Sequence, residues 1–348
     1  MIAASDSKAI NVCRLLCIFF MTFVHVNPGP EVWAEHSNIY GFDLLQFFSN
    51  FLGRASVPAL SIISGYLIVN SFYKSPDWFS FAKSKFKKLI VPLITWNLII
   101  ILFSLAVFYL VSLKTIQMRI LSGEELTFVR ILDLTIGLNY NSITEPLNFL
   151  RDIFVCSLIS PIFIFLYRAN KFIFLFLTWT ICLNFDITPV IMRDGILMFF
   201  SVGIALGVSK EKVFSLSHNN IIIMSTVVTS LFATYIANDS FSYYDLREYA
   251  LRVVVACAFM ISSYFLATKL THETTKKLGG YSFPLFLSHS LIFTVLWGFW
   301  QFFIGREVDS FYPVFYFSAP LFALIAVQLI MKTKKFFSPK INSLLWAQ

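Results

Sequence analysis

The sequence predicts an all-α integral membrane protein with about ten transmembrane helices and with both its N- and C-termini in the cytoplasm. First, its 348 residues are 57% hydrophobic and only 13% charged, which is about half the charged fraction of a soluble domain. Second, apolar stretches of about 20 residues, the length that crosses a bilayer, recur along the chain. Third, lysine and arginine gather in alternate connections between these stretches. This composition excludes a disordered chain, a coiled coil and a secreted disulfide-rich mini-protein.

The candidate spans can be read off in order. They cover roughly residues 10–28, 55–72, 89–112, 146–166, 171–187, 190–208, 219–238, 248–269, 281–303 and 310–331. The fifth is short for a crossing. The apolar stretch 41–52 is too short to span, and we expect it to be interfacial or re-entrant. The first span contains Arg14 and has no small-residue cleavage site, so we expect it to be retained rather than removed as a signal peptide.

The distribution of basic residues sets the expected orientation. The net charge of +8 is better explained by lysine and arginine on the cytoplasmic side than by binding to nucleic acid. With the N-terminus inside, the cytoplasmic connections, among them the cluster Lys83–Lys88, hold about three times as many basic residues as the outer ones. This bias persists from loop to loop, which supports ten spans. No soluble stretch interrupts the pattern, so residues 1–348 are expected to form a single membrane domain.

The cysteines predict neither a disulfide framework nor a metal site. All five lie in apolar runs, and no Cys/His cluster has the spacing of a metal site. Buried free cysteines behave as small hydrophobic side chains. We therefore interpret them as packing residues and expect no metal.

Charged residues inside a bilayer are costly, which makes each of them a functional candidate. Arg14 and His25 share the first span and are eleven positions apart, about three turns of an α-helix. They would project from one face about 16 Å apart along the axis. A cation at one end and an imidazole at the other suit a long ligand with an anionic head and a reactive tip, such as a coenzyme A thioester. The alternative is a structural hydrogen bond for His25 and a snorkelling Arg14.

A second constellation opens the second span, at residues 53–66. Arg54 is expected at the outer mouth of this span, where it could contact a lipid phosphate or a substrate. Pro58 frees backbone groups within the span. Ser64 and Gly65 are small enough to let two helices approach closely, and packing is the favoured interpretation for these small residues and for Pro58.

These motifs resemble those of the acyltransferase-3 membrane proteins. The resemblance rests on Arg14 and His25 separated by ten residues, followed by Arg54-x-x-Val57-Pro58 and Ser64-Gly65-Tyr66. Four further segments are similar to the family pattern in the expected order: 85–96, 147–152, 198–203 and 281–289. Two positions depart from it: Asn11 replaces a frequent acidic residue, which weakens any role for a carboxylate there, and Asn148 replaces a tryptophan, which leaves the shape of the site wall open.

The resemblance implies transfer of an acyl group, usually acetyl, from cytoplasmic acyl-CoA (acetyl-CoA) to a hydroxyl of a surface glycan or of its lipid-linked precursor. It also implies a bacterial inner membrane. His25 matches the essential histidine, which could act as a general base or carry the acyl group itself. Arg14 and Arg54 match the two motif arginines and could clamp phosphates or stabilise an oxyanion. With a cytoplasmic N-terminus, Arg14 is nearer the nucleotide end of the donor, and Arg54, which is nearer His25, is assigned to the reacting centre.

The remaining candidate residues are less specific. Ser64, Asn148 and His289 lie in matched segments and are expected to contact acyl-CoA, although His289 could equally be a core histidine. Arg151-Asp152 and Arg193-Asp194 are adjacent opposite charges. Neighbours in a helix do not face each other, so we expect each to find structural partners elsewhere. The long outer loops 29–54 and 113–145 are expected to recognise the acceptor.

Two other classes of function compete with an enzyme. Ten spans with buried charges also suit a transporter of glycans or small organic molecules. The sequence shows no duplicated halves and no matched pair of broken helices, and their lack disfavours a transporter. The second class is a non-catalytic structural or sensory protein. That interpretation would leave the shared face of Arg14 and His25 unexplained.

Overall fold

The computed structural model describes most of the chain. The described residues are 4–26, 44–75, 77–111, 127–139, 141–210, 246–304, 311–336 and 338–346. Two compact units are present: Met1–Ile63 with Glu211–Met331, and Ser64–Lys210 with Lys332–Gln348. The predicted span 219–238 and much of the loops 29–54 and 113–145 lie outside the described residues.

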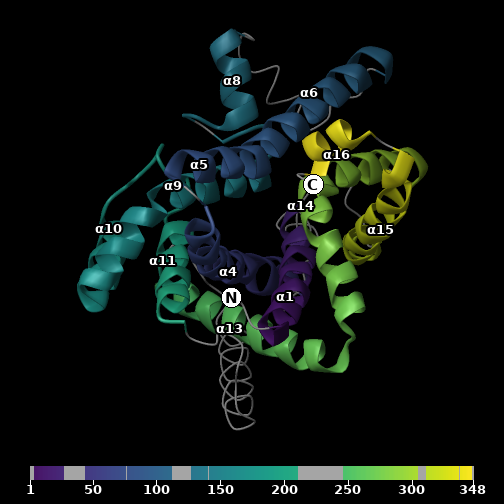
Figure 1. Cartoon of the computed structure of the whole chain (residues 1–348). Helices are drawn as coiled ribbons and strands as arrows, with labels where there is room; N and C mark the ends of the chain where they lie inside the picture. Colours follow the sequence, from purple (N-terminus) through teal and green to yellow (C-terminus); the bar gives the residue numbers. More distant parts are fainter. Residues whose placement is uncertain are drawn as a thin grey trace. The chain divides into compact units, whose positions relative to one another are not determined.

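The described regular structure is entirely helical (Figure 1), which confirms the predicted all-α class. The longer helices are α1 (Ala4–Thr22), α4 (Arg54–Tyr73), α6 (Val91–Val111), α9 (Asn148–Ala169), α10 (Lys171–Asn184), α11 (Asp194–Val208), α13 (Leu246–Lys269), α14 (His272–Phe303) and α15 (Tyr312–Thr333). The short helices are α3 (Leu44–Gln46), α5 (Trp78–Lys85), α8 (Phe128–Ile136) and α16 (Pro339–Trp346).

Seven helical segments of the described chain are long and apolar enough to cross a membrane: Ser5–His25, Phe47–Tyr73, Trp78–Tyr109, Glu145–Ala169, Arg252–Lys269, His272–Phe303 and Tyr312–Thr333. Two shorter apolar helices, α10 and α11, coincide with the fifth and sixth predicted spans. An integral membrane protein follows from these segments. The total of ten spans and the cytoplasmic position of both termini stay predictions.

The second span begins earlier than the sequence predicts. A π-helical segment, η2 (Phe47–Gly53), follows α3 directly and continues without a break into α4. The described part of the stretch 41–52 is therefore a helical extension of the second span, and its place relative to the membrane interface stays a prediction. Continuing the helix keeps the backbone groups of this apolar run hydrogen-bonded. Arg54 consequently lies within the span segment Phe47–Tyr73 rather than at its mouth.

The third span is likewise longer at its start. A short π-helical segment, η3 (Phe86–Ile90), joins α5 to α6, so the basic cluster Lys83–Lys88 lies on the same helical segment as the span. Asp77 caps the first turn of α5, where its carboxylate accepts hydrogen bonds from the backbone N–H of Ser80 at 2.7 Å and from its hydroxyl at 2.8 Å.

In the first unit, α1 packs against α13 and α14 (Figure 1). Gly279 of α14 makes this approach possible, because a Cβ there would lie 2.6 Å from the Asn11 side-chain oxygen. At the other end of α1, the Tyr316 hydroxyl of α15 lies 3.0 Å from both the Phe23 and the Leu45 carbonyl oxygens. These contacts hold the end of α1 between α3 and α15.

In the second unit, α9 packs against α10 and α11. Gly65 of α4 lies against Gly203 and Ile204 of α11, where a Cβ would meet the backbone N of Ile204 at 3.0 Å. This confirms that Gly65 serves close helix packing. The C-terminal helix α16 packs on α6, where the Trp96 indole N–H donates to the Leu345 carbonyl at 3.0 Å.

Candidate functional site

Two histidines from distant parts of the sequence meet in the first unit. His25 ends a 3-10 turn, η1 (Phe23–His25), that continues α1, and His289 lies in the middle of α14. Their ring centroids are 5.5 Å apart with an interplanar angle of 44°. This contact exists because α1 and α14 pack along their lengths.

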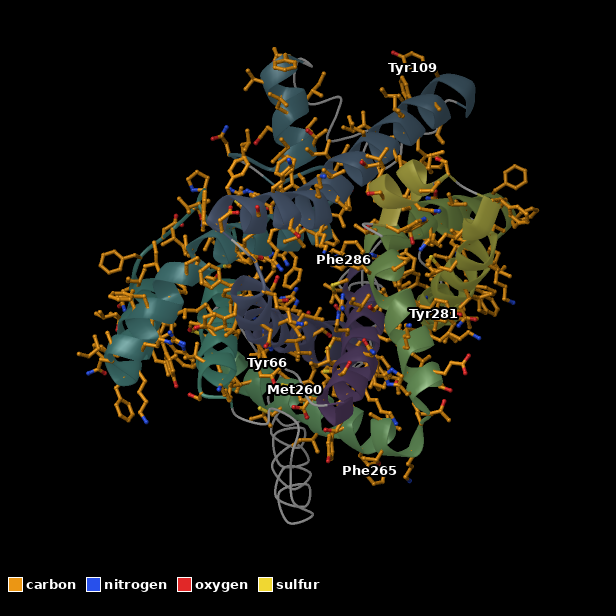
Figure 2. The ribbon with its side chains drawn as sticks, viewed as in Figure 1. Tyr66, Tyr109, Met260, Phe265, Tyr281 and Phe286 are labelled. Atoms are coloured by element: carbon orange, nitrogen blue, oxygen red, sulfur yellow. The ribbon has the colours of Figure 1, made fainter. Side chains whose placement is uncertain are left out.

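His289 is held in a single orientation by its own helix. The residue is fully buried, and its Nδ1 lies 2.8 Å from the Phe286 carbonyl oxygen and 3.2 Å from that of Leu285. Phe286 is one of the labelled residues of Figure 2. Carbonyl oxygens only accept hydrogen bonds, so these contacts assign the proton to Nδ1. In the neutral ring Nε2 is then an acceptor, and the Ser290 hydroxyl lies 3.4 Å from it.

The proximity of the two rings limits how many protons they hold. Two positive charges 5.5 Å apart would repel by about 3 kcal/mol at an effective dielectric constant of about 20. The pair therefore favours states in which at least one imidazole is neutral. A neutral imidazole can accept a proton from a hydroxyl or attack an acyl group.

Arg14 supplies a cation on the helix that carries His25. Among the described residues, no carboxylate or carbonyl forms an ion pair or hydrogen bond with its guanidinium. A 3-10 turn winds more tightly than an α-helix, and His25 stands at the end of such a turn, η1. That Arg14 and His25 project from one face stays a prediction.

Arg54 lies where the second span meets the end of α1. It directly follows Gly53, whose added Cβ would lie 2.5 Å from a Val24 methyl group and 3.0 Å from the Phe20 carbonyl oxygen. Val24 in turn precedes His25. Gly53 and Val24 thus lie close together, and each is followed in the chain by a candidate site residue, Arg54 and His25 respectively. The preceding segment η2 is π-helical, a rare conformation that is frequent at functional sites.

Ser64 and Asn148 belong to the second unit, and their predicted contact with acyl-CoA stays a prediction. Asn148 is fully buried. Its side-chain oxygen accepts from the Ser142 backbone N–H at 3.1 Å, and its nitrogen donates to the Asn141 side-chain oxygen at 2.8 Å. Both ends of the amide thus hold the preceding loop onto the start of α9.

The charged pairs of the second unit form a structural network. The Arg151 guanidinium donates to the carbonyls of Leu138 and Pro189, and Asp152 accepts from the backbone N–H of Met192 at 3.1 Å. Arg193 pairs with Glu145 at 2.8 Å. These contacts confirm the expectation of partners elsewhere in the chain for Arg151, Asp152 and Arg193. They do not do so for Asp194, whose buried Oδ1 has no hydrogen-bond partner among the described residues. Arg151 and Asp152 also touch each other at 3.4 Å, a contact that the helix argument did not predict.

Sequence reasoning missed the pairing of His25 with His289. The two residues are far apart in the sequence, and neither hydropathy nor charge links them. The one available signal was that both lie in segments matched to the same family pattern. It suggested a common site but not a ring contact.

The seven long apolar helical segments among the described residues define the class of the protein, an integral membrane protein. The chain belongs to the acyltransferase-3 family, whose acyltransferase domain matches residues 7–332. This confirms the resemblance carried by the motifs. Among characterised proteins, the succinoglycan biosynthesis protein ExoH of Rhizobium meliloti (strain 1021) is 28% identical over 339 residues, which cover 92% of this chain and 86% of that protein. No solved structure is significantly similar to the chain.

Proposed function

We propose that the protein transfers an acyl group, most simply acetyl, from cytoplasmic acyl-CoA to a hydroxyl of a cell-surface polysaccharide or of its lipid-linked precursor, within a bacterial inner membrane. The family supports acyl transfer. The name of the relative ExoH, a succinoglycan biosynthesis protein, supports a glycan acceptor. The observation that carries the proposal is the contact of His25 with His289 at the end of the span that also bears Arg14.

The chemistry requires one proton acceptor near the acceptor hydroxyl. The hydroxyl oxygen forms a bond to the acyl carbon while the bond from that carbon to the coenzyme A sulfur breaks. His25 takes the hydroxyl proton and returns it to the leaving thiolate. In a second route, an imidazole nitrogen of His25 bonds to the acyl carbon while the bond to the coenzyme A sulfur breaks, and coenzyme A leaves as the thiol with the imidazole proton. The hydroxyl oxygen then takes the acyl carbon from the imidazole, and the hydroxyl proton returns to the ring. Both routes use a neutral imidazole at the same place.

The two arginines have complementary tasks in this proposal. Arg14, which has no carboxylate partner among the described residues, would bind the phosphates of the donor. Arg54, next to the contact between Gly53 and Val24, would stabilise the negative charge that develops on the thioester oxygen. The contacts of Ser64, Asn148 and His289 with acyl-CoA that the family resemblance implies remain part of this proposal.

The test is acyl transfer by the purified full-length protein in liposomes. Labelled acetyl-CoA is supplied outside, and a membrane glycan fraction is the acceptor. We expect His25→Ala to lower transfer at least about 100-fold, because general base catalysis contributes about 10²–10⁴-fold. The matched control is His272→Ala, which removes an exposed histidine at the first residue of α14 and is expected to leave transfer unchanged.

Three outcomes would decide against the proposal or between its routes. Normal transfer by His25→Ala would exclude the catalytic role. Movement of labelled glycan across the liposome without acetyl-CoA would establish a transporter instead. Label retained on the wild-type protein when the acceptor is omitted, and absent from His25→Ala, would select the acyl-histidine route.

A further inference from the structure

An apolar groove lies in the second unit among α9, α10 and α11. Its volume is about 390 Å³, and α10 contributes one face at helical spacing with Ile173, Phe174, Leu177 and Ile181. The polar lining residues are already engaged. The Thr178 hydroxyl donates to the Phe174 carbonyl at 2.8 Å, and the Asn170 side-chain oxygen accepts from two backbone N–H groups of α10. The groove therefore suits a hydrocarbon.

Basic residues mark one end of this groove. Ala169 and Asn170 line the groove and are flanked in the chain by the exposed Arg168 and Lys171. The Arg168 guanidinium lies 5.4 Å from the centre of the Tyr73 ring, at the last residue of α4. Lys74 directly follows Tyr73 in the chain and is the third cation near this contact.

A hydrogen bond brings in a fourth cation. The Tyr167 hydroxyl of α9 lies 2.6 Å from the Ser209 hydroxyl, directly after α11, and Lys210 is the next residue. The ends of α4 and α11 are thus tied to the end of α9. Asp77, the nearest acidic residue along the chain from Tyr73 and Lys74, adds one negative charge at the start of α5. The four basic residues outnumber it, so the described helix ends at this end of the groove carry a net positive charge.

A hydrocarbon groove with a cationic end is the complement of an anionic lipid. In a membrane protein, basic pockets between helices near the surface bind lipid phosphates, and an apolar groove gives an acyl chain surroundings as apolar as the lipid tails of the bilayer. We propose that this groove holds an acyl chain of an anionic phospholipid, with its phosphate bound by Arg168 and Lys171. This inference does not depend on the proposed acyl transfer.

Native mass spectrometry of the purified full-length protein tests the proposal. Phosphatidylglycerol and phosphatidylcholine are the two probes. We expect the wild type to retain phosphatidylglycerol at least about 5-fold more than phosphatidylcholine, and Arg168→Gln/Lys171→Gln to abolish this preference. The matched control is Lys83→Gln/Lys87→Gln, which removes two exposed cations from α5 and η3 of the same unit but none from the groove, and is expected to keep the preference.

A second pair of variants tests the groove itself. Leu177→Trp fills the groove and is expected to lower retention of phosphatidylglycerol at least about 10-fold, the lower end of the 10–200-fold range that one methylene in an apolar pocket can cost. Phe176→Trp changes a neighbouring residue that is 70% exposed and does not line the groove, and is expected to have no effect.

The proposal would be overturned by equal retention of the two lipids, by equal losses in the two double variants, or by unchanged retention in Leu177→Trp. Each variant is first compared with the wild type by thermal unfolding, and only folded variants enter the measurement of lipid retention. Preferential binding of a polyprenyl phosphate over phosphatidylglycerol at the same residues would also overturn it, because the occupant would then be another lipid.

Discussion

At the scale of single residues, the orientation of His289 is the most specific feature of the candidate site. Two carbonyl oxygens of its own helix fix the proton on Nδ1, which leaves Nε2 as the acceptor on the other side of the ring. The side chain is buried and in ring contact with Phe293 as well as with His25. A histidine that serves only the packing of the core would need only the hydrogen bonds of Nδ1 to its own helix. A histidine that takes part in proton transfer also needs Nε2.

Amide substitutions separate these two roles of His289. An asparagine amide reaches about as far as Nδ1, and a glutamine amide reaches about as far as Nε2. We expect His289→Asn to lower acyl transfer about 100-fold, the lower end of the contribution of proton transfer by a side chain, and His289→Gln to retain more of it, with similar thermal stability in both variants. The rate of transfer from labelled acetyl-CoA measures this difference. Equal activities of the two variants would show that Nε2 has no part in the reaction.

At the scale of helices, two adjacent glycines of α14 have opposite surroundings. A Cβ at Gly279 would lie 2.6–2.8 Å from three side-chain atoms of Asn11, whereas at Gly280 nothing lies within 4 Å. Asn11 is one of the positions that depart from the family pattern. Its contact with Gly279 assigns it to the packing of α1 on α14, which is the packing that brings the two histidines together.

These surroundings predict opposite effects of the same substitution. We expect Gly279→Ala to destabilise the protein by about 1–3 kcal/mol, because α1 and α14 must separate. Gly280→Ala is expected to be neutral or to stabilise by up to about 1 kcal/mol, because alanine favours a helix interior. Thermal unfolding in detergent measures both. A loss of stability in Gly280→Ala as large as that in Gly279→Ala would contradict the helix contact.

The start of α5 predicts a pH dependence outside the spans. Hydrogen bonds from the backbone and side chain of Ser80 favour the ionised form of Asp77 and lower the pKa of its carboxyl below 3.8. Because the pKa is lowered in the folded protein, the ionised cap stabilises the helix fully at pH values above the ordinary carboxyl pKa. This stabilisation is lost as the pH falls through the lower pKa of the folded protein.

Hydrogen exchange over residues 78–82, corrected for the intrinsic pH dependence of exchange, tests this cap. Protection in the wild type is expected to fall below pH 3.8. Asp77→Asn should keep part of the protection at every pH without that fall, and Asp77→Ala should lose it throughout. Identical profiles for Asp77→Asn and the wild type would exclude ionisation as the cause.

At the scale of the whole molecule, the structure supports the predicted grouping of basic loops. Three segments predicted to face the cytoplasm, around Lys74, Arg168 and Lys210, are connected at one end of the second unit by the contacts Tyr73–Arg168 and Tyr167–Ser209. The pair of Glu145 and Arg193 lies beside the start of α9, whereas Arg168 lies in its last turn. A single span that begins at Glu145 and ends at Ala169 separates the two groups.

Cysteine labelling from either side of the membrane tests this orientation. We expect Lys74→Cys and Lys210→Cys to react with an impermeant maleimide only from the cytoplasm, and Glu145→Cys only from outside. The native cysteines of the described chain are mostly buried and give the background in the unsubstituted protein. Reaction of Lys74→Cys and Lys210→Cys from opposite sides would show that the span count between them is wrong.

The candidate site was predictable only as a set of residues. His25, Arg14, Arg54 and His289 stand in motifs that the sequence displays, and the separation of Arg14 from His25 follows from helical geometry. The contact of His25 with His289 did not follow, because it depends on how α14 lies against α1. The 3-10 turn and the π-helical segment η2 also escaped prediction, since a change of winding leaves no periodic signal in a uniformly apolar stretch.

The sequence by itself determined the class of the protein, because hydropathy is summed over about 20 residues and survives local errors. It also determined the family, because the motifs occur in a fixed order along the chain. Only the tertiary structure decided which side chains meet. The absence of Cβ at Gly279 and Gly53 lets backbones approach, and such contacts between distant segments are a property of the packed helices rather than of any one stretch of sequence.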